Sequence, residues 1–381
     1  MSRRVAHRVL YVVDSLGLGG AERGLVLTLR HLDPERVRPE VAMLWDPDTL
    51  ASEISALGIP VHRLRARRGP AALLRIFRLA RLLRRRRFDA VHTQVLWASI
   101  TGRIAGRLAR VKVISHVLNV DPGRTRLGEV GSVLALKIRL VGALDELTGR
   151  SLVDRFVAIS QAVREHPIRG RSWPRDRISV VDRGQDVEAL STEAALEPSP
   201  PIESLHGPVV LTVGRLAPQK GHRYLLRAMG DVVHEFPDAR LLLAGEGHLH
   251  EELRALADPL GDHVTFLGLR GDVPALLRRS HVFVFPSLWE GVGTALREAM
   301  LLGRPVVASD IPAHREFVTH GVDGLLVPPA DAEALAAAIL RLLHDPEEAA
   351  AIGRRAARSA ARFDIRRTTE ELEAIYDDVI P

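Results

Sequence analysis

The sequence contains no cysteine, few aromatic residues and no long apolar run, and each absence excludes a class of protein. Without cysteine the chain forms neither disulfides nor thiolate metal sites. Aromatic residues make up only 4% of the chain, and Phe77 is the single one within its arginine-rich stretch, which argues against a protein that stacks nucleic-acid bases. No apolar run approaches the roughly 18 residues of a membrane span, and Val9–Val13 is too short for a signal-peptide core. We therefore expect a cytoplasmic protein.

Length and charge add two further expectations. The 381 residues suffice for two compact domains, and 46% apolar with 26% charged residues is typical of a globular protein. The net charge of +6 is unevenly distributed, with 34 basic against 19 acidic side chains through residue 190 and 19 against 28 beyond it. The basic first half predicts an anionic partner.

Apolar runs alternate with helical patterns along the chain, which predicts an α/β fold with parallel strands. The expected strands are Val9–Val13, Pro39–Leu44, Ala90–His92, Val111–His116, Phe156–Ile159, Pro208–Val213, Ala239–Ala244, His263–Leu267, His281–Phe285 and Pro305–Ala308. A stretch rich in Pro, Ser and Glu predicts an interdomain linker at residues 189–207. The expected domains are therefore residues 1–188 and 208–362, with a terminal amphipathic helix at residues 363–381.

The most informative stretch follows the apolar run His281–Phe285, where Gly291 and Gly293 interrupt the chain before a helical pattern. The amides and dipole at a helix start attract phosphate. Glu290 lies in the turn, and Glu298 lies about one helical turn beyond the glycines. Two carboxylates around phosphate-binding amides suit a nucleotide sugar, which has hydroxyls at both ends and a diphosphate between. The alternative is an ordinary glycine turn with surface glutamates.

Together with Gly303-Arg304-Pro305 downstream, this stretch resembles the E-x7-E signature of retaining glycosyltransferases of family GT4. The resemblance covers nearly the whole chain and is most specific from Gly214 to Ser309. It implies the GT-B fold: two Rossmann-like domains whose parallel sheets face a central cleft, with the C-terminal helix returning to the first domain. The first domain would bind the acceptor and the second the nucleotide-sugar donor.

The same resemblance implies roles for individual residues. The segment Gly214–Gly221 matches the family's basic loop, so Arg215 and Lys220 would bind the donor phosphates and stabilise the leaving group. Glu290 would bind donor-sugar hydroxyls and Glu298 ribose hydroxyls. His116 would lie beside the donor sugar as a fourth catalytic residue with Arg215, Lys220 and Glu290. The implied donor-binding positions are Gly19, Gly20, Arg215, Lys220, Gly268, Arg270, Glu290, Gly291, Val292, Gly293, Thr294 and Glu298.

Near the N-terminus, the glycines at 17, 19 and 20 resemble the family's first loop but do not form G-x-G-x-x-G. A dinucleotide site is disfavoured, because no acidic residue ends the next expected strand. A plain tight turn remains the alternative. Two positions depart from the family pattern: Gln94 where a histidine is common, and Arg183 where an asparagine is common. The first departure puts an acceptor role for the Gln94 loop in doubt.

No H-E-x-x-H, P-loop or EF-hand pattern occurs, so the sequence implies no metal. The pair Asp46-Pro47-Asp48 resembles a cation-binding D-x-D, but it follows an early strand away from the donor motifs. We expect a loop there.

The range Arg63–Arg87 carries eleven arginines. Arg75, Arg78 and Arg81 recur every three residues and predict a helix with one cationic stripe. Such a helix either docks on anionic lipid headgroups or covers the sheet with a solvated arginine face.

The resemblance implies a metal-independent hexosyltransferase (EC 2.4) that uses a UDP- or GDP-sugar and retains anomeric configuration. No residue is placed as a covalent nucleophile, so a front-face mechanism is implied. The acceptor stays open between a glycolipid, an exopolysaccharide or cell-envelope glycan, and a small molecule. If the acceptor is a lipid, we expect the protein to lie peripherally on the inner face of the membrane. Two alternatives are a nucleotide-sugar epimerase of the same fold and a non-catalytic sugar-nucleotide or membrane-binding protein.

Overall fold

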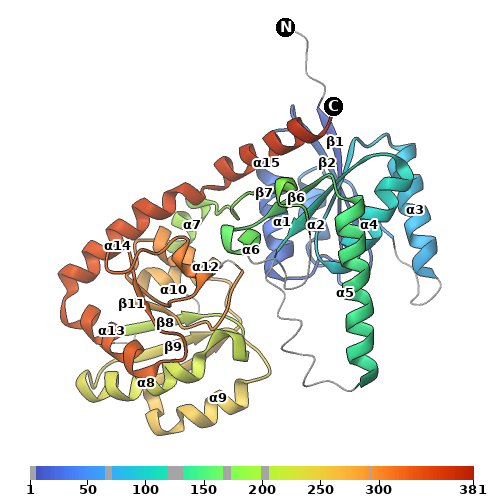
Figure 1. Cartoon of the computed structure of the whole chain (residues 1–381). Helices are drawn as coiled ribbons and strands as arrows, with labels where there is room; N and C mark the ends of the chain where they lie inside the picture. Colours follow the sequence, from blue (N-terminus) through green and yellow to red (C-terminus); the bar gives the residue numbers. More distant parts are fainter. Residues whose placement is uncertain (1–5, 65–70, 119–131, 166–172, 199–205, 292) are drawn as a thin grey trace. The chain divides into compact units, whose positions relative to one another are not determined.

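The computed structural model describes residues 6–64, 71–118, 132–165, 173–198, 206–291 and 293–381. The chain divides into two compact units (Figure 1). The first unit combines Met1–Gly184 with Ile365–Pro381, and the second is Gln185–Asp364. The second unit is therefore inserted between two parts of the first. Among the described helices, none is long and apolar enough to span a bilayer.

The described part of the first unit forms a seven-stranded sheet in the order β3-β2-β1-β4-β5-β6-β7, and all its strand pairs are parallel. The strands are β1 (His7–Val13), β2 (Val37–Met43), β3 (Val61–Arg63), β4 (Ala90–Thr93), β5 (Lys112–Val117), β6 (Arg155–Ala158) and β7 (Ile178–Val180). The helices are α1 (Gly20–His31), α2 (Ala51–Ala56), α3 (Ala71–Arg85), α4 (Leu96–Ala109), α5 (Ser132–Leu152), α6 (Gln161–Glu165) and α15 (Ile365–Val379).

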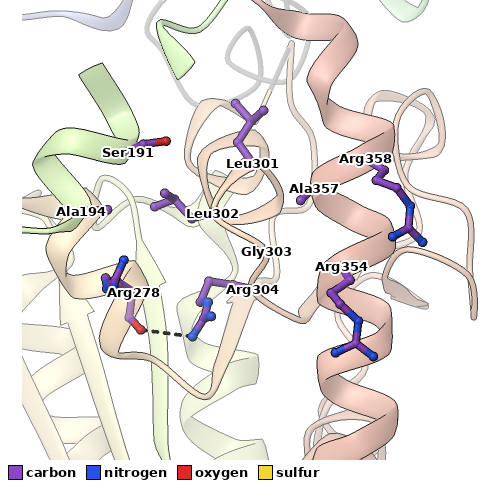
Figure 2. A pocket seen from close by; sticks show the side chains of 10 residues that line it. All are labelled: Ser191, Ala194, Arg278, Leu301, Leu302, Gly303, Arg304, Arg354, Ala357 and Arg358. Atoms are coloured by element: carbon purple, nitrogen blue, oxygen red, sulfur yellow. Dashed lines mark hydrogen bonds between the residues drawn. The ribbon is translucent and has the colours of Figure 1, made fainter. Parts of the chain in front are cut away.

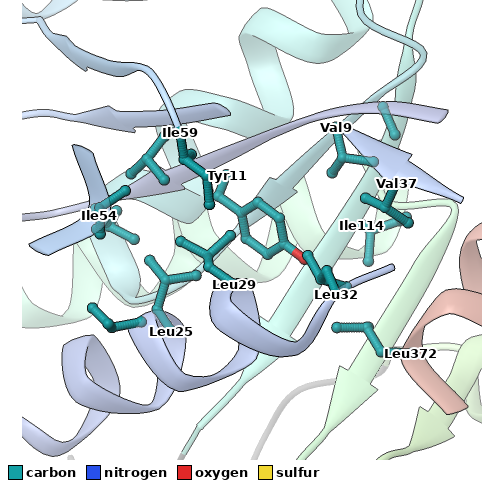
Figure 3. Close-up of a cluster of buried hydrophobic side chains, with 14 of the residues drawn as sticks. Val9, Tyr11, Leu25, Leu29, Leu32, Val37, Ile54, Ile59, Ile114 and Leu372 are labelled. Carbon is teal, nitrogen blue, oxygen red and sulfur yellow. The ribbon is translucent and has the colours of Figure 1, made fainter. Parts of the chain in front are cut away.

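Alternate side chains of β1 point to opposite faces of this sheet, as the pleat requires. Val9, Tyr11 and Val13 pack against apolar residues of α1, α2 and α15 (Figure 3). Leu10 and Val12, also fully buried, point to the other face, where α3, α4 and α5 pack side by side (Figure 1). Helices therefore cover both faces, which is what an all-parallel sheet needs.

A chain of buried hydrogen bonds fastens α15 to the sheet. The hydroxyls of Tyr11 on β1 and Tyr376 on α15 lie 2.5 Å apart, and Nδ1 of His92 on β4 lies 2.6 Å from the Tyr376 hydroxyl. All three side chains are fully buried. At the helix surface, Arg36 donates to Glu373 at 2.7 Å and to Asp377 at 2.8 Å. The C-terminal helix is thus part of the first unit's core.

The second unit contains, among its described residues, a six-stranded sheet in the order β10-β9-β8-β11-β12-β13, again with parallel pairs only. The strands are β8 (Val209–Val213), β9 (Arg240–Ala244), β10 (Val264–Gly268), β11 (Val282–Phe285), β12 (Val306–Ser309) and β13 (Leu325–Val327). The helices are α7 (Val187–Ala194), α8 (His222–Glu235), α9 (His250–Ala257), α10 (Val273–Arg279), α11 (Thr294–Leu301), α12 (Pro312–Arg315), α13 (Ala332–His344) and α14 (Pro346–Ala360).

Two apolar clusters cover the faces of this second sheet. Val210, Leu241 and Val284 pack against residues of α8, α9 and α13, whereas Leu211 and Phe285 pack against residues of α10, α11 and α14. Each sheet with helices on both faces is a Rossmann-like domain. The predicted α/β class and the return of the C-terminal helix to the first domain are confirmed.

The expected linker is partly wrong. The second unit begins at Gln185, and residues 187–194 form α7, which packs against α10. The Asp186 side chain accepts a hydrogen bond from the Ala189 amide at 2.9 Å and so starts this helix. The proline-rich residues 199–205 lie outside the described residues.

We expect Tyr376→Phe to destabilise the first unit by about 1–3 kcal/mol, because the Tyr11 hydroxyl and His92 Nδ1 lose a buried partner. Urea unfolding followed by tryptophan fluorescence measures the change, since Trp45, Trp97 and Trp173 all belong to the first unit. The control is Tyr224→Phe on α8, which should stay within about 0.5 kcal/mol of the wild type. Equal stability of Tyr376→Phe and the wild type would show that this network does not hold α15.

Candidate functional site

The loops that follow β8 and β11 meet at one edge of the second sheet. These two strands are neighbours at the point where the strand order reverses, which is where open parallel sheets bind ligands. The Leu288 amide donates to the Gln219 carbonyl at 2.7 Å, and Gln219 Nε2 donates to the Trp289 carbonyl at 2.8 Å. The predicted basic loop and the predicted glutamate turn therefore form one structure.

Gly221 permits this close approach. Its φ of +65° lies in the left-handed region, and a Cβ placed there would come within 2.0 Å of the Pro286 carbonyl oxygen. Any other residue would both strain the backbone and separate the two loops. Gly221 ends the short turn Pro218–Lys220 and starts α8, so it fixes the position of Lys220.

Lys220 forms an ion pair with Glu290 across the two loops. The side chains are only 16% and 9% exposed, and the Lys220 ammonium lies 4.7 Å from the centre of the Phe285 ring. The other Glu290 oxygen lies 3.4 Å from Gln219 Nε2. A cation and a carboxylate are thus adjacent at the carboxyl ends of β8 and β11.

Two buried histidines near Lys220 were not predicted from the sequence. Burial, with a further contribution from the Lys220 charge, lowers the pKa of His222 to about 4 and that of His314 to about 4. His314 Nδ1 lies 2.7 Å from the Ser309 carbonyl oxygen. Within the described residues, His222 Nδ1 and His314 Nε2 have no hydrogen-bond partner. Both rings are therefore neutral at pH 7, and they add no charge beside Lys220.

Arg215 lies just after β8 and is exposed. Its guanidinium makes no side-chain hydrogen bond or ion pair within the part of the chain that the structure describes. It remains available to an anion next to the Lys220–Glu290 pair.

Three glycines bring the ends of β8, β9 and β10 together. The Gly214 amide donates to the Ala244 carbonyl at 2.9 Å, and the Gly245 amide donates to the Gly268 carbonyl at 2.7 Å. A Cβ on Gly245 would lie 2.0 Å from the Gly214 carbonyl oxygen. The resulting edge presents backbone rather than side chains.

Arg270 forms a bidentate ion pair with Asp272. Its Nε and Nη2 donate to the two carboxylate oxygens of Asp272, at 2.7 and 2.5 Å, and this pairing raises the pKa of Arg270. At the expected donor-binding positions Gly268 and Arg270, this leaves mainly backbone groups for a ligand.

Helix α11 begins as expected at Thr294, with Gly293 as its N-cap and no capping side chain. A Cβ on Gly293 would approach the Phe285 ring to 2.9 Å, so the helix start lies close to the end of β11. Gly291 is buried and Glu298 is half-buried, whereas Val292 lies outside the described residues. The helix start therefore adjoins the Lys220–Glu290 loops.

In the first unit, His116 lies near the end of β5 and faces a cavity of about 40 Å³, also lined by Gln94 and Arg183. Both of its ring nitrogens are shielded from solvent and have no hydrogen-bond partner within the described residues. Its ring stacks on His92 with centroids 5.3 Å apart. Burial, with a smaller contribution from the Arg183 charge, lowers the pKa of His116 to about 3.

Arg183 lies across the predicted glycine loop. A Cβ on Gly24 would meet the Arg183 guanidinium at 2.1 Å, and one on Gly20 would lie 3.7 Å from it. Gly19 is the N-cap of α1 without a capping side chain, and the Glu22 carboxylate folds over it. The departure from asparagine at position 183 thus adds a cation beside His116.

Asp14 is a further residue that the sequence analysis did not single out. It lies just after β1 and accepts a hydrogen bond from the Ala98 amide at 2.6 Å, in the first turn of α4. Burial raises the pKa of its carboxyl to about 6. This bond to an amide in the first turn of α4 stabilises a half-buried carboxylate there.

The Asp46-Pro47-Asp48 segment lies in a loop, as expected. Asp48 accepts a hydrogen bond from Arg63 Nε at 2.9 Å. The described residues contain no group of three or more side chains placed to hold a metal ion.

The expected cationic stripe on α3 is partly wrong. Arg75 is buried, with its guanidinium 5.1 Å from the Trp45 ring centre, whereas Arg78 and Arg81 are exposed. Leu73 and Phe77 are 64% and 62% exposed, so the outer face of α3 is apolar as well as cationic. Residues 65–70 of the arginine-rich range lie outside the described residues.

Two family models match the chain. One, described as a glycosyl transferase 4-like domain, matches residues 19–184, and the other, described as glycosyl transferases group 1, matches residues 207–345. Among curated relatives, the UDP-Gal:alpha-D-GlcNAc-diphosphoundecaprenol alpha-1,3-galactosyltransferase of Escherichia coli is 29% identical over 277 residues, or 70% of this chain and 69% of the relative.

A second relative is the phosphatidyl-myo-inositol mannosyltransferase of Mycolicibacterium smegmatis, which is 34% identical over 203 residues. This match covers 52% of this chain and 51% of the relative. The crystal structure of HepE from Anabaena in complex with UDP superimposes with a TM-score of 0.81 at 23% identity, covering 97% of this chain and 100% of that one. That likeness confirms the GT-B fold.

We expect acidification to destabilise the wild type more than a His116→Gln variant. In the unfolded chain the histidine takes up a proton near pH 6.5, but in the folded protein it does so only near pH 3. The free energy of unfolding of the wild type is therefore highest above pH 6.5 and falls as the pH drops below that value. Between pH 7.5 and pH 5 the wild type should lose about 2 kcal/mol more than the variant. His92 is present in both proteins, and because burial rather than His116 is the main cause of its lowered pKa, its contribution largely cancels. Urea unfolding at both pH values tests this, and parallel losses would contradict a neutral buried His116.

Proposed function

This chain belongs to the group 1 glycosyl transferases, and from that premise we propose that it is a metal-independent, retaining hexosyltransferase. It moves a hexose from a UDP- or GDP-sugar to a hydroxyl of a glycolipid or cell-envelope glycan. The observation that carries this proposal is the Lys220–Glu290 pair, held by Gly221 where β8 and β11 end.

The donor diphosphate binds Lys220 and Arg215. The ammonium has three donors and the guanidinium a planar fork, and both suit phosphate oxygens. Because His222 and His314 are neutral at pH 7, the positive charge of this region resides on Lys220 and Arg215. Two fixed cations neutralise charge on a departing diphosphate, which a divalent metal does in other transferases.

The remaining parts of the donor bind around this pair. Glu290 accepts hydrogen bonds from sugar hydroxyls, and Glu298 in α11 accepts those of the ribose. The uncapped amides at Gly293 add a favourable dipole for the phosphates. The backbone edge formed by Gly245 and Gly268 is suited to a flat base.

The reaction breaks the bond between the anomeric carbon and the phosphate oxygen, and it forms a bond from that carbon to the acceptor oxygen on the same face. The acceptor proton passes to the departing phosphate oxygen. His116 stays neutral because burial lowers its pKa to about 3. Its role beside the donor sugar is a prediction of the family resemblance.

A lipid-linked acceptor accords with the names of relatives, whose acceptors include GlcNAc-diphosphoundecaprenol and phosphatidyl-myo-inositol. Helix α3 supports the same idea, because exposed Leu73 and Phe77 stand beside exposed Arg78 and Arg81. An apolar face flanked by arginines suits an interface with anionic lipid. We place the protein on the inner face of the membrane through this helix.

We expect UDP or GDP to raise the melting temperature of the wild type and of Glu290→Gln by similar amounts in the presence of EDTA. The variant keeps the shape of the side chain but loses its charge toward the sugar. Release of nucleoside diphosphate from the matching nucleotide sugar should fall by about 100-fold or more.

The matched control is Glu251→Gln, which changes a 91% exposed glutamate of the same domain and should keep full turnover. Turnover of Glu290→Gln within about twofold of wild type would exclude a catalytic role for Glu290. Absence of any nucleotide shift in the wild type would favour a non-catalytic relative.

We expect Arg78→Gln/Arg81→Gln to weaken binding to phosphatidylglycerol-containing vesicles by about 30-fold, because each cation near an anionic surface contributes about 1 kcal/mol. The control Arg227→Gln/Arg254→Gln removes the same charge from exposed sites on α8 and α9. Vesicle co-sedimentation at fixed ionic strength measures both. An equal loss in the two variants would show that net charge, not α3, sets the affinity.

A further inference from the structure

A second pocket, of about 620 Å³, lies in the second unit away from the Lys220–Glu290 loops (Figure 2). Its lining comes from α7, the last turns of α10 and α11, the loop after α11, and α14. Leu301 and Leu302 at the end of α11 contribute its apolar part. The volume is that of a small-molecule site.

Four arginines line this pocket, Arg278, Arg304, Arg354 and Arg358, and no lining residue is acidic. Figure 2 shows Arg278 and Arg304 on one side and Arg354 and Arg358 along α14 on the other. The cations therefore flank the pocket rather than gather at one point.

Within the part of the chain that the structure describes, no acidic side chain pairs with Arg278, Arg354 or Arg358. Arg354 and Arg358 are four residues apart on one helix, an arrangement in which like charges repel. Glu348, on the same helix, forms an ion pair with Arg341.

Arg304 is held in place at the pocket wall. Its Nη1 donates to the carbonyls of Arg278 at 3.1 Å and Ser280 at 3.2 Å. Its Nε is buried, and within the described residues it has no hydrogen-bond partner. Burial and the charge of Arg278 both lower the pKa of Arg304.

We propose that this pocket binds a small molecule carrying two or more phosphate groups. Guanidinium forks match phosphate oxygens, and cations on opposite sides call for more than one anionic group. Nucleic acid is disfavoured because no aromatic side chain lines the pocket.

The pocket is separate from the proposed donor site. Helix α11 has its first residue, Thr294, beside the donor loops and its last, Leu301, in the pocket. Seven residue steps at 1.5 Å separate those ends by about 10 Å. Both sites therefore have room for a ligand at once, and the pocket does not depend on the proposed reaction.

Isothermal titration of the full chain with sodium tripolyphosphate tests the proposal. Arg354→Gln/Arg358→Gln should weaken binding by at least about tenfold, since two charge-assisted contacts are lost. Arg227→Gln/Arg254→Gln, with the same change of charge, and Arg215→Gln, in the donor loop, should each keep the pocket affinity. All five positions are exposed, so the variants should fold.

Each other result overturns the proposal. Equal weakening by the pocket and control variants would mean attraction to net charge alone. Loss only in Arg215→Gln would place the tripolyphosphate in the donor loop. A third result would be that tripolyphosphate does not bind the wild type but phosphatidylglycerol vesicles do. If Arg354→Gln/Arg358→Gln then loses vesicle binding, the ligand is a lipid headgroup and not a free small molecule.

Discussion

Among the described residues both sheets contain only parallel strand pairs, and the positions of the candidate sites follow from that constraint. Parallel strands put their carboxyl ends at one edge, and a reversal of strand order leaves two of those ends side by side. In the second unit these are the ends of β8 and β11, and their loops carry Lys220 and Glu290. The first unit repeats the arrangement with β1 and β4, and Asp14 bridges their following segments by accepting from the Ala98 amide. Topology therefore determines which motifs meet.

Within that edge, close backbone contact and burial set the charge state of the site. Gly221 and Gly245 let neighbouring loops touch, and the contact leaves little room for water around Lys220 and Glu290. The buried imidazoles stay neutral because desolvation penalises their charged form. Such a site suits a diphosphate, because no protonated histidine repels Lys220 or Arg215. Both cations are then available to the phosphate oxygens.

The sequence predicted much of this fold because interior strands are continuous apolar runs, as Val282–Phe285 illustrates. It missed β3, β7 and β13, three-residue strands whose pattern is too short to recognise. Lys220 and Glu290 carried recognisable motifs, but their pairing was invisible because it depends on sheet order. His222 and His314 carried no signal of burial beside a cation. Arg75 was misplaced because a three-residue spacing slips around a helix of 3.6 residues per turn.

The insertion of one domain into the other has a consequence for biosynthesis. The chain passes from one unit to the other at two points, 184/185 and 364/365, and these points lie close together. Gln185 forms a β-bridge with Asp364, and a Cβ on Gly184 would meet the backbone of Ile365 at 2.6 Å. During translation, residues 185–364 are synthesised before Tyr376, the hydroxyl partner of Tyr11. The first unit therefore cannot complete its core until α15 has been synthesised, after the whole of the second unit. Until α15 has been made, one face of the first unit's sheet lacks a helix that covers it.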